Sequence, residues 1–379
     1  MPEQLRIGIN AQIVTFAATY RQAGVSRFTE QLILALQQRD GDARYSVFVN
    51  ETARGGFSDS ANMRFHYTRL PAHRPLVRIA WEQCLLPLAA RSLDVLHCPV
   101  NVLPLLSPCP TVLTVHDLTF VRYPERFKPE RRRYLAASTR MSAKRARRIT
   151  ADSANTKTDL AAEFGVPEDK IDVVYPGVDP EFHPLSAAQA AEFRGRAGLP
   201  DEFILFVGTL EPRKNLDLLI EAYVLLKRQM PSPPPLIVAG ARGWMFDRIF
   251  AAVERHGLTD DVRFPGYVAS EDLASWYSAA TVFVYPSLYE GFGLPALEAM
   301  ACGTPVVVSN VSSLPEVVGD AGAQVDPHQP EQLASALAEI LQSKSKREQM
   351  AAAGLQRAAT FTWSRAAEQI ARIYRQAAA

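Results

Sequence analysis

Short apolar runs alternate with amphipathic helical patterns along the chain, and this alternation most constrains the fold. Runs such as "LRIGIN" (5–10) and "FILFVG" (203–208) are typical of strands buried on both faces. Segments such as "LDLLIEAYVLLKRQM" (216–230) lie between them and repeat leucine and alanine at helical spacing. Strands and helices that alternate in this way form parallel sheets covered by helices on both faces, so the predicted fold class is α/β.

The number of strand-like runs predicts two domains. Twelve runs occur, at 5–10, 45–50, 94–98, 111–116, 147–152, 171–176, 203–208, 235–240, 261–266, 281–287, 304–310 and 323–327. Twelve strands in one sheet would be unusual, and 379 residues exceed one ordinary core. We therefore predict two doubly wound, Rossmann-like domains, 1–180 and 201–363, that face a central cleft. The proline-rich stretch near the midpoint, "YPGVDPEFHP", indicates a linker over 181–200.

Composition excludes several classes of protein. The four cysteines form no C-x-x-C pair, which argues against zinc sites and thioredoxin-type chemistry. No apolar run approaches the ~20 residues of a membrane-spanning helix. The first ten residues, "MPEQLRIGIN", run into a strand without the apolar region of a signal peptide. These features favour a reducing cytoplasm.

The stretch "YEGFGLPALEAMACG" (289–303) places two glutamates around a glycine-rich loop. Glu290 precedes Gly-Phe-Gly, and Glu298 lies about one turn inside the helix expected to begin near Pro295. Glycines at a helix start allow backbone N–H groups to approach an anion, and phosphate is the natural guest. The match to the dinucleotide fingerprint G-x-G-x-x-A lies too deep in the chain to favour an oxidoreductase. For the two glutamates alone, solvated surface carboxylates remain an equal alternative.

Two adjacent cations add to this expectation. In "VGTLEPRKNLDLL" (207–219), Arg213 and Lys214 follow a predicted strand and precede a predicted helix. Cations oppose the helix dipole at that end, and a bound anion would remove the penalty. Arg213 offers a planar fork and Lys214 a point charge, which together suit a diphosphate.

At these residues the sequence resembles the retaining glycosyltransferases of family four, which have the two-domain GT-B fold. The resemblance depends on "EGFGLPALE" and "GTLEPRKN", and further on "TVHDL" (114–118), "ADSANTK" (151–157) and "YPGVD" (175–179), in the order of that family. It covers nearly the whole chain, and it is closest to bacterial mannosyltransferases of polysaccharide and O-antigen assembly. The resemblance also implies that the last helix, 364–379, packs back on the first domain.

The resemblance implies a role for each matching residue. Arg213 and Lys214 would hold the donor diphosphate, and Glu298 the ribose. Glu290 would hold the donor sugar, together with the amides of Phe292, Gly293 and Leu294, which would also hold the distal phosphate. His116 would lie beside the reacting sugar carbon, Gly24 would give room near phosphate or acceptor, and the backbone near Tyr267 and Val268 would meet the base. Many relatives carry an arginine in a Gly-Arg-Leu triplet where this chain has Gly208-Thr209-Leu210, and we assume that Arg213 replaces it.

The implied reaction is transfer of a hexose, best matched by mannose from GDP-mannose, to a saccharide or lipid-linked saccharide with retention of configuration. The one Asp-x-Asp match, Asp40-Gly41-Asp42, is typical of a turn, so we expect no metal and no other cofactor. A glycosidase would also use two carboxylates, but it has no use for a diphosphate pocket. The alternatives kept open are a UDP-sugar-dependent glucosyl- or GlcNAc-type transferase, a nucleotide-sugar epimerase, a sugar phosphorylase and an inactive nucleotide-sugar binder.

A strongly basic segment lies in the first predicted domain. Between Arg126 and Arg148 there are ten lysines and arginines and one acidic residue, Glu130. Apolar Tyr134, Leu135 and Met141 are interleaved with them. A basic amphipathic surface suits anionic lipid headgroups at the inner face of the cell membrane, or a pyrophosphate-linked lipid acceptor. A solvated helix and nonspecific affinity for nucleic acid are alternatives, and no motif for specific nucleic-acid recognition accompanies the charge.

Overall fold

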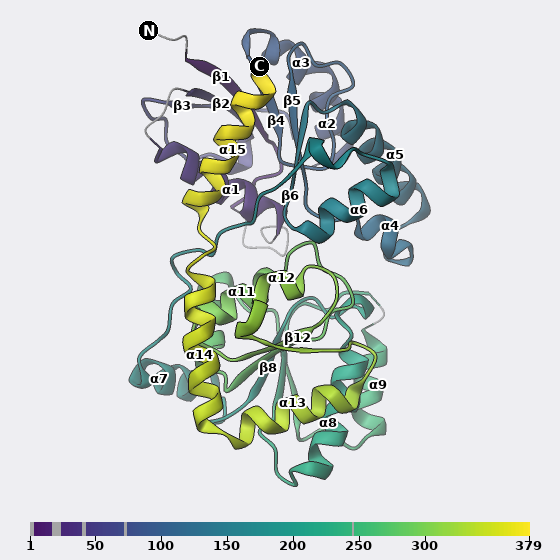
Figure 1. Cartoon of the computed structure of the whole chain (residues 1–379), viewed down its shortest axis with the longest axis vertical. Helices are drawn as coiled ribbons and strands as arrows, with labels where there is room; N and C mark the ends of the chain where they lie inside the picture. The colour runs from purple at the N-terminus through teal and green to yellow at the C-terminus, as the bar shows by residue number, and fades with distance from the viewer. Residues whose placement is uncertain (1–3, 17–23, 40–42, 72–73, 245) are drawn as a thin grey trace. The chain divides into compact units, whose positions relative to one another are not determined.

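Two compact units make up the chain, each built on a parallel sheet (Figure 1). The computed structural model describes residues 4–16, 24–39, 43–71, 74–244 and 246–379. The first unit contains residues 1–177 and 362–379, and the second contains 178–361. The prediction of two doubly wound α/β domains is confirmed.

The first unit contains a seven-stranded sheet of order β3-β2-β1-β4-β5-β6-β7. The strands are β1 (Leu5–Ala11), β2 (Ala43–Asn50), β3 (Met63–Thr68), β4 (Val95–Cys98), β5 (Thr111–Val115), β6 (Arg148–Ala151) and β7 (Ile171–Val173). Every pairing between neighbours is parallel; in the longest register, Leu5 pairs with Ala43 and Ala11 with Val49. The chain passes from β3 back across β1 to β4, so the order of the strands reverses between β1 and β4.

Helices cover both faces of this sheet, as the buried strands require. They are α1 (Val25–Gln37), α2 (Pro75–Ala80), the π-helix η3 (Trp81–Leu85), α3 (Leu86–Ala89), α4 (Thr119–Arg122), α5 (Pro129–Arg145), α6 (Ala154–Phe164) and α15 (Trp363–Ala378). Single 3₁₀ turns are η2 (Glu51–Ala53), η4 (Ala90–Ser92), η5 (Pro124–Arg126) and η6 (Glu168–Lys170). Ile7 and Ile9 of β1 belong to a core with α1 and α15, and Trp81 belongs to a second core with β4, β5 and α6.

The last helix, α15, packs against α1 and completes the core of the first unit. Its Tyr374 hydroxyl contacts Nδ1 of His97 at 2.7 Å, and His97 Nε2 contacts the Thr114 hydroxyl at 2.8 Å. Complete burial lowers the pKa of His97 to about 3, so this histidine is neutral and structural.

The second unit contains a six-stranded sheet of order β10-β9-β8-β11-β12-β13. Its strands are β8 (Ile204–Val207), β9 (Leu236–Ala239), β10 (Val262–Gly266), β11 (Val282–Tyr285), β12 (Val306–Ser309) and β13 (Ala323–Val325), all paired in parallel. Its helices are α7 (Ala187–Ala197), α8 (Leu216–Gln229), α9 (Asp247–Arg255), α10 (Leu273–Ala279), α11 (Leu294–Ala301), α12 (Leu314–Val318), α13 (Pro330–Gln342) and α14 (Lys344–Ala358). The 3₁₀ turns are η7 (Pro212–Lys214), η8 (Ser270–Asp272) and η9 (Gly319–Ala321). Here the order of the strands reverses between β8 and β11.

Two expectations need correction. The stretch 181–200 is not a linker, because it belongs to the second unit and contains α7, which packs against α10. Ser186 and Gln189 form a capping box at the start of α7, a signal of a helix inside the stretch that proline content obscured. Strand β3 was not predicted, because this edge strand is only partly buried and lacks a continuous apolar run.

Candidate functional site

The predicted anion-binding residues of the second unit follow β8 and β11, the two strands between which the order reverses. Arg213 and Lys214 lie in η7 after β8, and Glu290 lies in the loop after β11. In doubly wound sheets, ligands bind in the crevice outside the carboxyl ends of such a strand pair. The topology therefore supports a ligand site at these loops.

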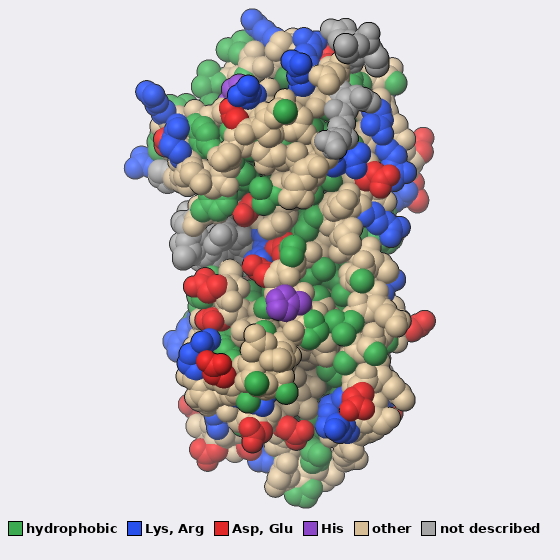
Figure 2. Space-filling view, turned by 90° about the vertical axis from the view of Figure 1, so that its left-hand side faces the viewer, with side chains coloured by type: hydrophobic (Ala, Val, Ile, Leu, Met, Phe, Trp, Pro, Cys, Tyr) green, Lys and Arg blue, Asp and Glu red, His purple; other side chains and the backbone are tan. Residues whose placement is uncertain are grey.

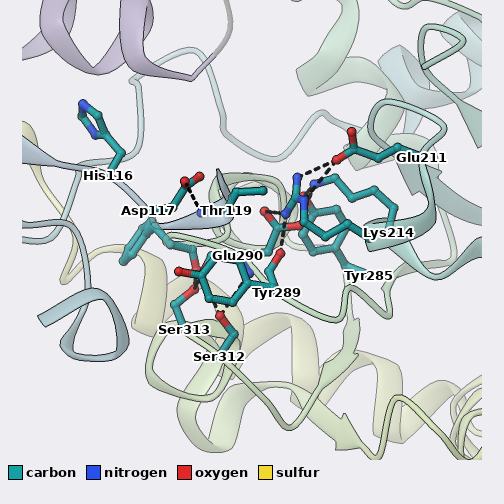
Figure 3. A network of polar contacts seen from close by, with 12 residues as sticks. His116, Asp117, Thr119, Glu211, Lys214, Tyr285, Tyr289, Glu290, Ser312 and Ser313 are labelled. Atoms are coloured by element: carbon teal, nitrogen blue, oxygen red, sulfur yellow. Dashed lines mark hydrogen bonds and ion pairs between the residues drawn. The ribbon is translucent and has the colours of Figure 1, made fainter. Parts of the chain in front are cut away.

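The structure brings Arg213, Lys214 and Glu290 into direct contact. Glu290 Oε2 lies 2.8 Å from Nη1 of Arg213, and Oε1 lies 2.6 Å from Nζ of Lys214. Arg213 also donates to Oε1 of Glu211, from Nε at 3.1 Å and from Nη2 at 2.8 Å. Lys214 donates a further hydrogen bond to the Tyr285 hydroxyl. Figure 3 shows Glu211, Lys214 and Tyr285 gathered on one side of Glu290.

This cluster of Glu211, Arg213, Lys214 and Glu290, the carboxylate–cation cluster, is almost completely buried. Burial opposes ionisation of Glu290, but the charges of Arg213 and Lys214 outweigh it and lower the pKa of Glu290 to about 2. Desolvation lowers the pKa of Lys214 to about 8, in spite of the attraction of Glu290. Two carboxylates, Glu211 and Glu290, thus contact the two cations, Arg213 and Lys214. They neutralise the positive charge that the sequence analysis had expected a bound anion to neutralise. An incoming diphosphate would have to replace part of these contacts.

The glycine loop is held by serines that follow the next strand, β12. The backbone N–H of Glu290 donates to the Ser312 hydroxyl at 3.0 Å, and the Ser313 hydroxyl donates to the Phe292 carbonyl at 2.6 Å. Gly293 has a φ of 114°, and a Cβ there would lie 2.7 Å from Cδ2 of Leu314. The positive φ therefore favours glycine at 293, and any larger side chain would also displace Leu314.

The remaining residues predicted to bind the nucleotide-sugar donor, Glu298, Tyr267 and Val268, are not members of the carboxylate–cation cluster. Helix α11 begins at Leu294, one residue before the predicted start, and Glu298 lies one turn inside it. Glu298 is buried, and its Oε2 accepts a hydrogen bond of 2.9 Å from the Tyr277 hydroxyl. Tyr267 and Val268 follow the edge strand β10, where Tyr267 is exposed. They share the carboxyl edge of the sheet with Arg213 but are separated from β8 by β9.

His116 and Gly24 belong to the first unit. His116 follows β5, and its Nδ1 lies 2.7 Å from Oδ2 of Asp152, which follows β6. Its Nε2 lies 3.1 Å from the carbonyl oxygen of Pro99, so acceptors face both ring nitrogens. Gly24 immediately precedes α1 with a φ of 65°. A Cβ at Gly24 would meet no atom within 4 Å, so its glycine requirement comes from the backbone conformation.

The environment of His116 favours the imidazolium. Burial opposes the charged form, but the charge and hydrogen bond of Asp152 and the bond to Pro99 outweigh it and raise the pKa of His116 above 6.5. Two acceptors are satisfied only when both ring nitrogens carry protons. Both ring nitrogens of His116 are thus engaged by acceptors, an arrangement that stabilises the protonated ring.

The His116–Asp152 pair should make stability depend on pH. Because the folded-state pKa of His116 is raised, the pair stabilises the fold fully below pH ~6.5 and loses this contribution as the pH rises through the folded-state pKa. We expect the urea midpoint to fall between pH 6 and pH 9, and the fall to be smaller in Asp152→Asn. Equal pH profiles for the two proteins would contradict this account.

Sequence reasoning missed Glu211, Tyr285, Ser312 and Ser313. A sequence signal existed for Glu211, which lies two residues before Arg213 in the same motif, "GTLEPRKN"; the structure shows that this carboxylate is buried. No local signal identifies the serines, because their contact with Glu290 depends on the pairing of β12 with β11. Asp40-Gly41-Asp42 lies outside the described residues. Among the residues that the structure describes, no group of three or more His, Cys, Asp or Glu side chains is arranged to hold a metal ion.

Comparisons with known proteins show the family and the fold of the chain. Residues 189–377 match the family model described as glycosyl transferases group 1, and residues 23–182 match that of glycosyltransferase family 4. O-antigen chain mannosyltransferase B of Escherichia coli is 40% identical over 265 residues, which is 70% of each chain. The serotype-specific mannosyltransferase WbdA of Escherichia coli is 32% identical over 266 residues, covering 69% of this chain and 32% of the longer WbdA.

A solved structure of similar fold is HepE of Anabaena in complex with UDP-glucose. Its TM-score is 0.74, with 19% sequence identity over 97% of this chain and 99% of HepE. This likeness is one of fold, and it extends over both units.

Proposed function

The chain belongs to glycosyltransferase family 4, and from this we propose that it transfers mannose from GDP-mannose to a saccharide or lipid-linked saccharide during synthesis of a cell-surface polysaccharide. The observation that carries this proposal is Glu290, held by Arg213 and Lys214 at the strand-order reversal of the second unit. The enzyme is a hexosyltransferase by its family. The names of its mannosyltransferase relatives support the choice of sugar.

The donor diphosphate would enter the carboxylate–cation cluster. Lys214 and Arg213 would turn from Glu290 toward the phosphates, and the start of α11 adds the positive end of its dipole. Charge that develops on the leaving diphosphate would be stabilised by these fixed groups. Glu290, released from one cation, would accept hydrogen bonds from the sugar hydroxyls.

We further propose retention of configuration without a metal. Arg213 and Lys214 supply the two positive charges that a divalent ion would otherwise bring to the diphosphate. In the proposed reaction the acceptor attacks the face that the leaving phosphate vacates, and the phosphate takes the proton of the acceptor. The imidazolium of His116 supplies a fixed charge to the reacting centre and takes no proton.

A donor panel with product analysis tests the proposal. Thermal shift with GDP-mannose, UDP-glucose and UDP-GlcNAc identifies the donor, because a ligand at 100 times its Kd stabilises the fold by ~2.7 kcal/mol. Transfer of labelled mannose to a saccharide, with an α-anomeric product by NMR and undiminished by EDTA, is the expected result. Stabilisation by a UDP-sugar alone would replace the donor assignment. Transfer that requires a divalent metal would overturn metal independence. Turnover that depends on phosphate would indicate a phosphorylase. Isomerisation of the donor in the absence of an acceptor would indicate an epimerase.

Glu298 is expected to act on donor binding more than on turnover. Its carboxylate is already oriented by the Tyr277 hydroxyl, which suits a hydrogen bond to a ribose hydroxyl. We expect Glu298→Ala to raise the donor KM about tenfold, the value of one charged hydrogen bond, with kcat changed by less than about threefold. Steady-state kinetics with Tyr277→Phe as a companion should give a smaller rise in KM. A loss confined to kcat would contradict the ribose role.

We also propose that the first unit contacts an anionic bilayer. The lysines and arginines from Arg126 to Arg147 are exposed, whereas Arg148 is paired with Asp172 at 2.6 Å. Eight of the ten exposed large hydrophobic residues among the described part of the chain lie in the same unit: Leu70, Leu76, Leu85, Leu88, Leu105, Leu106, Tyr134 and Met141. Figure 2 views the first unit from the side opposite α5, the left-hand side of Figure 1, and basic side chains lie beside hydrophobic ones on that face too. No described helix is both long and apolar enough to span a membrane.

Vesicle co-sedimentation tests the bilayer contact. We expect binding to phosphatidylglycerol vesicles and little to phosphatidylcholine vesicles. Replacing Arg131, Arg132 and Arg133 with glutamine should weaken binding ~100-fold, at about 1 kcal/mol for each cation. The matched control replaces three exposed arginines of the second unit, Arg228, Arg248 and Arg255. Equal binding to both lipids would contradict the proposal.

A further inference from the structure

A second polar cluster lies where the strand order of the first unit reverses, between β1 and β4. Asn10 lies near the carboxyl end of β1, and Gln12 follows that strand directly. Asn101 follows the end of β4 by three residues. Crevices outside the carboxyl ends of such a strand pair hold ligands in doubly wound sheets. Neither Gln12 nor Asn101 is used by the donor site of the second unit.

Glu82 is the charged member of this cluster. The π-helix η3 carries it, and such helical irregularities occur frequently at functional sites. Glu82 is 6% exposed, and its Oε1 accepts a hydrogen bond of 3.1 Å from Nδ2 of Asn10. Nε of Arg78 lies 3.8 Å from the same oxygen. The Arg78–Glu82 pair leaves the cluster without net charge.

Three polar atoms of two carboxamides lack hydrogen-bond partners among the residues that the structure describes. Gln12 is 2% exposed, and neither its Oε1 nor its Nε2 has a hydrogen-bond partner there; the same holds for Oδ1 of Asn101. The position of Gln12 is nevertheless well determined: its N–H donates to Oδ1 of Asn10 at 3.4 Å, and its carbonyl accepts from Asn50 at 2.8 Å. Buried polar groups without partners are rare and call for a specific explanation.

The chemistry of the cluster selects a neutral, hydroxyl-rich ligand. Carboxamides donate and accept at once, and so do the hydroxyls of a sugar. A phosphate would meet the carboxylate of Glu82, and Arg78 is already paired with that carboxylate. An apolar ligand would leave Gln12 unsatisfied.

From this placement we propose that Gln12, Asn101 and Glu82 form the subsite that binds a sugar unit of the saccharide acceptor. The inference rests on the proposed transferase function, and it assigns the acceptor contacts to named residues of the first unit. Gln12 and Asn101 each bind a hydroxyl of that sugar through their carboxamides. Glu82 accepts a hydrogen bond from a third hydroxyl, and Asn10 and Arg78 hold Glu82 in position.

Direct binding of α-linked mannobiose to the full chain tests the subsite, with saturation-transfer NMR and calorimetry as readouts. We expect Gln12→Ala and Asn101→Ala each to weaken mannobiose binding about tenfold, the loss of one to two hydrogen bonds. GDP-mannose binding, followed by thermal shift, should change less than about twofold. Glu168→Gln removes an exposed carboxylate of the same unit and should change neither.

The outcomes separate this inference from the proposed function. Unchanged mannobiose affinity in both Gln12→Ala and Asn101→Ala would overturn the subsite, as would a wild-type chain that binds GDP-mannose but no mannobiose. A chain that binds mannobiose through Gln12 but no nucleotide sugar would support the subsite and overturn the transferase proposal. Gln12→Ala removes groups without partners and Asn101 is partly exposed, so one variant remains informative if the other fails to fold.

Discussion

Glu290→Gln should lower kcat by about 10²–10³-fold, the usual loss when one electrostatic contact to the reacting centre is removed. The substitution keeps the volume of the side chain but removes the charge that faces Arg213 and Lys214. Without that charge, the sugar hydroxyls keep only the weaker, neutral acceptor of the carboxamide, while the diphosphate keeps both cations. The donor KM should therefore change by less than about threefold.

The measurement is steady-state transfer of mannose by purified wild-type and variant enzyme. Glu254→Gln, an exposed carboxylate on α9 of the same unit, is the matched control and should be indistinguishable from wild type. If Glu290→Gln raises KM with normal kcat while Glu298→Ala lowers kcat, the two carboxylates have been assigned the wrong way round.

The second large effect is on stability. Arg213→Met should lower the free energy of unfolding of the second unit by about 3–5 kcal/mol, because it removes the cation that contacts both buried carboxylates, Glu211 and Glu290, and leaves Glu290 with Lys214. Side-chain exposure is 2% for Glu211 and 11% for Glu290, so water cannot replace the arginine. The double variant Arg213→Met/Glu211→Gln should recover part of the loss, because it also removes one of the two buried negative charges that had contacted the arginine.

Urea unfolding, followed by fluorescence and circular dichroism, measures this loss. Arg255→Met provides the control, since Arg255 is exposed on α9. A loss below ~1 kcal/mol, the value of a surface ion pair, would show that the carboxylate–cation cluster is hydrated in solution.

Much of the fold could be predicted because parallel strands buried on both faces leave continuous apolar runs. "FILFVG" and "TVFVYPS" became β8 and β11, whereas β3, exposed on one side, left no such run. The capping box that starts α7 was present in the sequence, but the surrounding prolines favoured a linker. Local patterns thus identified the buried elements and failed where burial is partial.

The residues of the donor site could be predicted from the sequence, but the contacts between them could not. Arg213, Lys214 and Glu290 were recognisable from strand ends and glycines, but their mutual ion pairs depend on β8 and β11 lying side by side. Likewise, Asn10 of β1 and Glu82 of η3 are 72 residues apart in sequence, and a hydrogen bond between their side chains joins the two elements. Contacts of this kind come from the order of strands in the sheet, which no local pattern determines.

The return of α15 to the first unit has a consequence for biosynthesis. Ile7, Ile9 and Leu32 share a core with Ile370 and Tyr374, which leave the ribosome only after the whole of the second unit. Domains fold as units while the chain is being made. The second unit is therefore expected to mature first, and the first unit to keep an apolar surface open to chaperones until translation reaches its last helix.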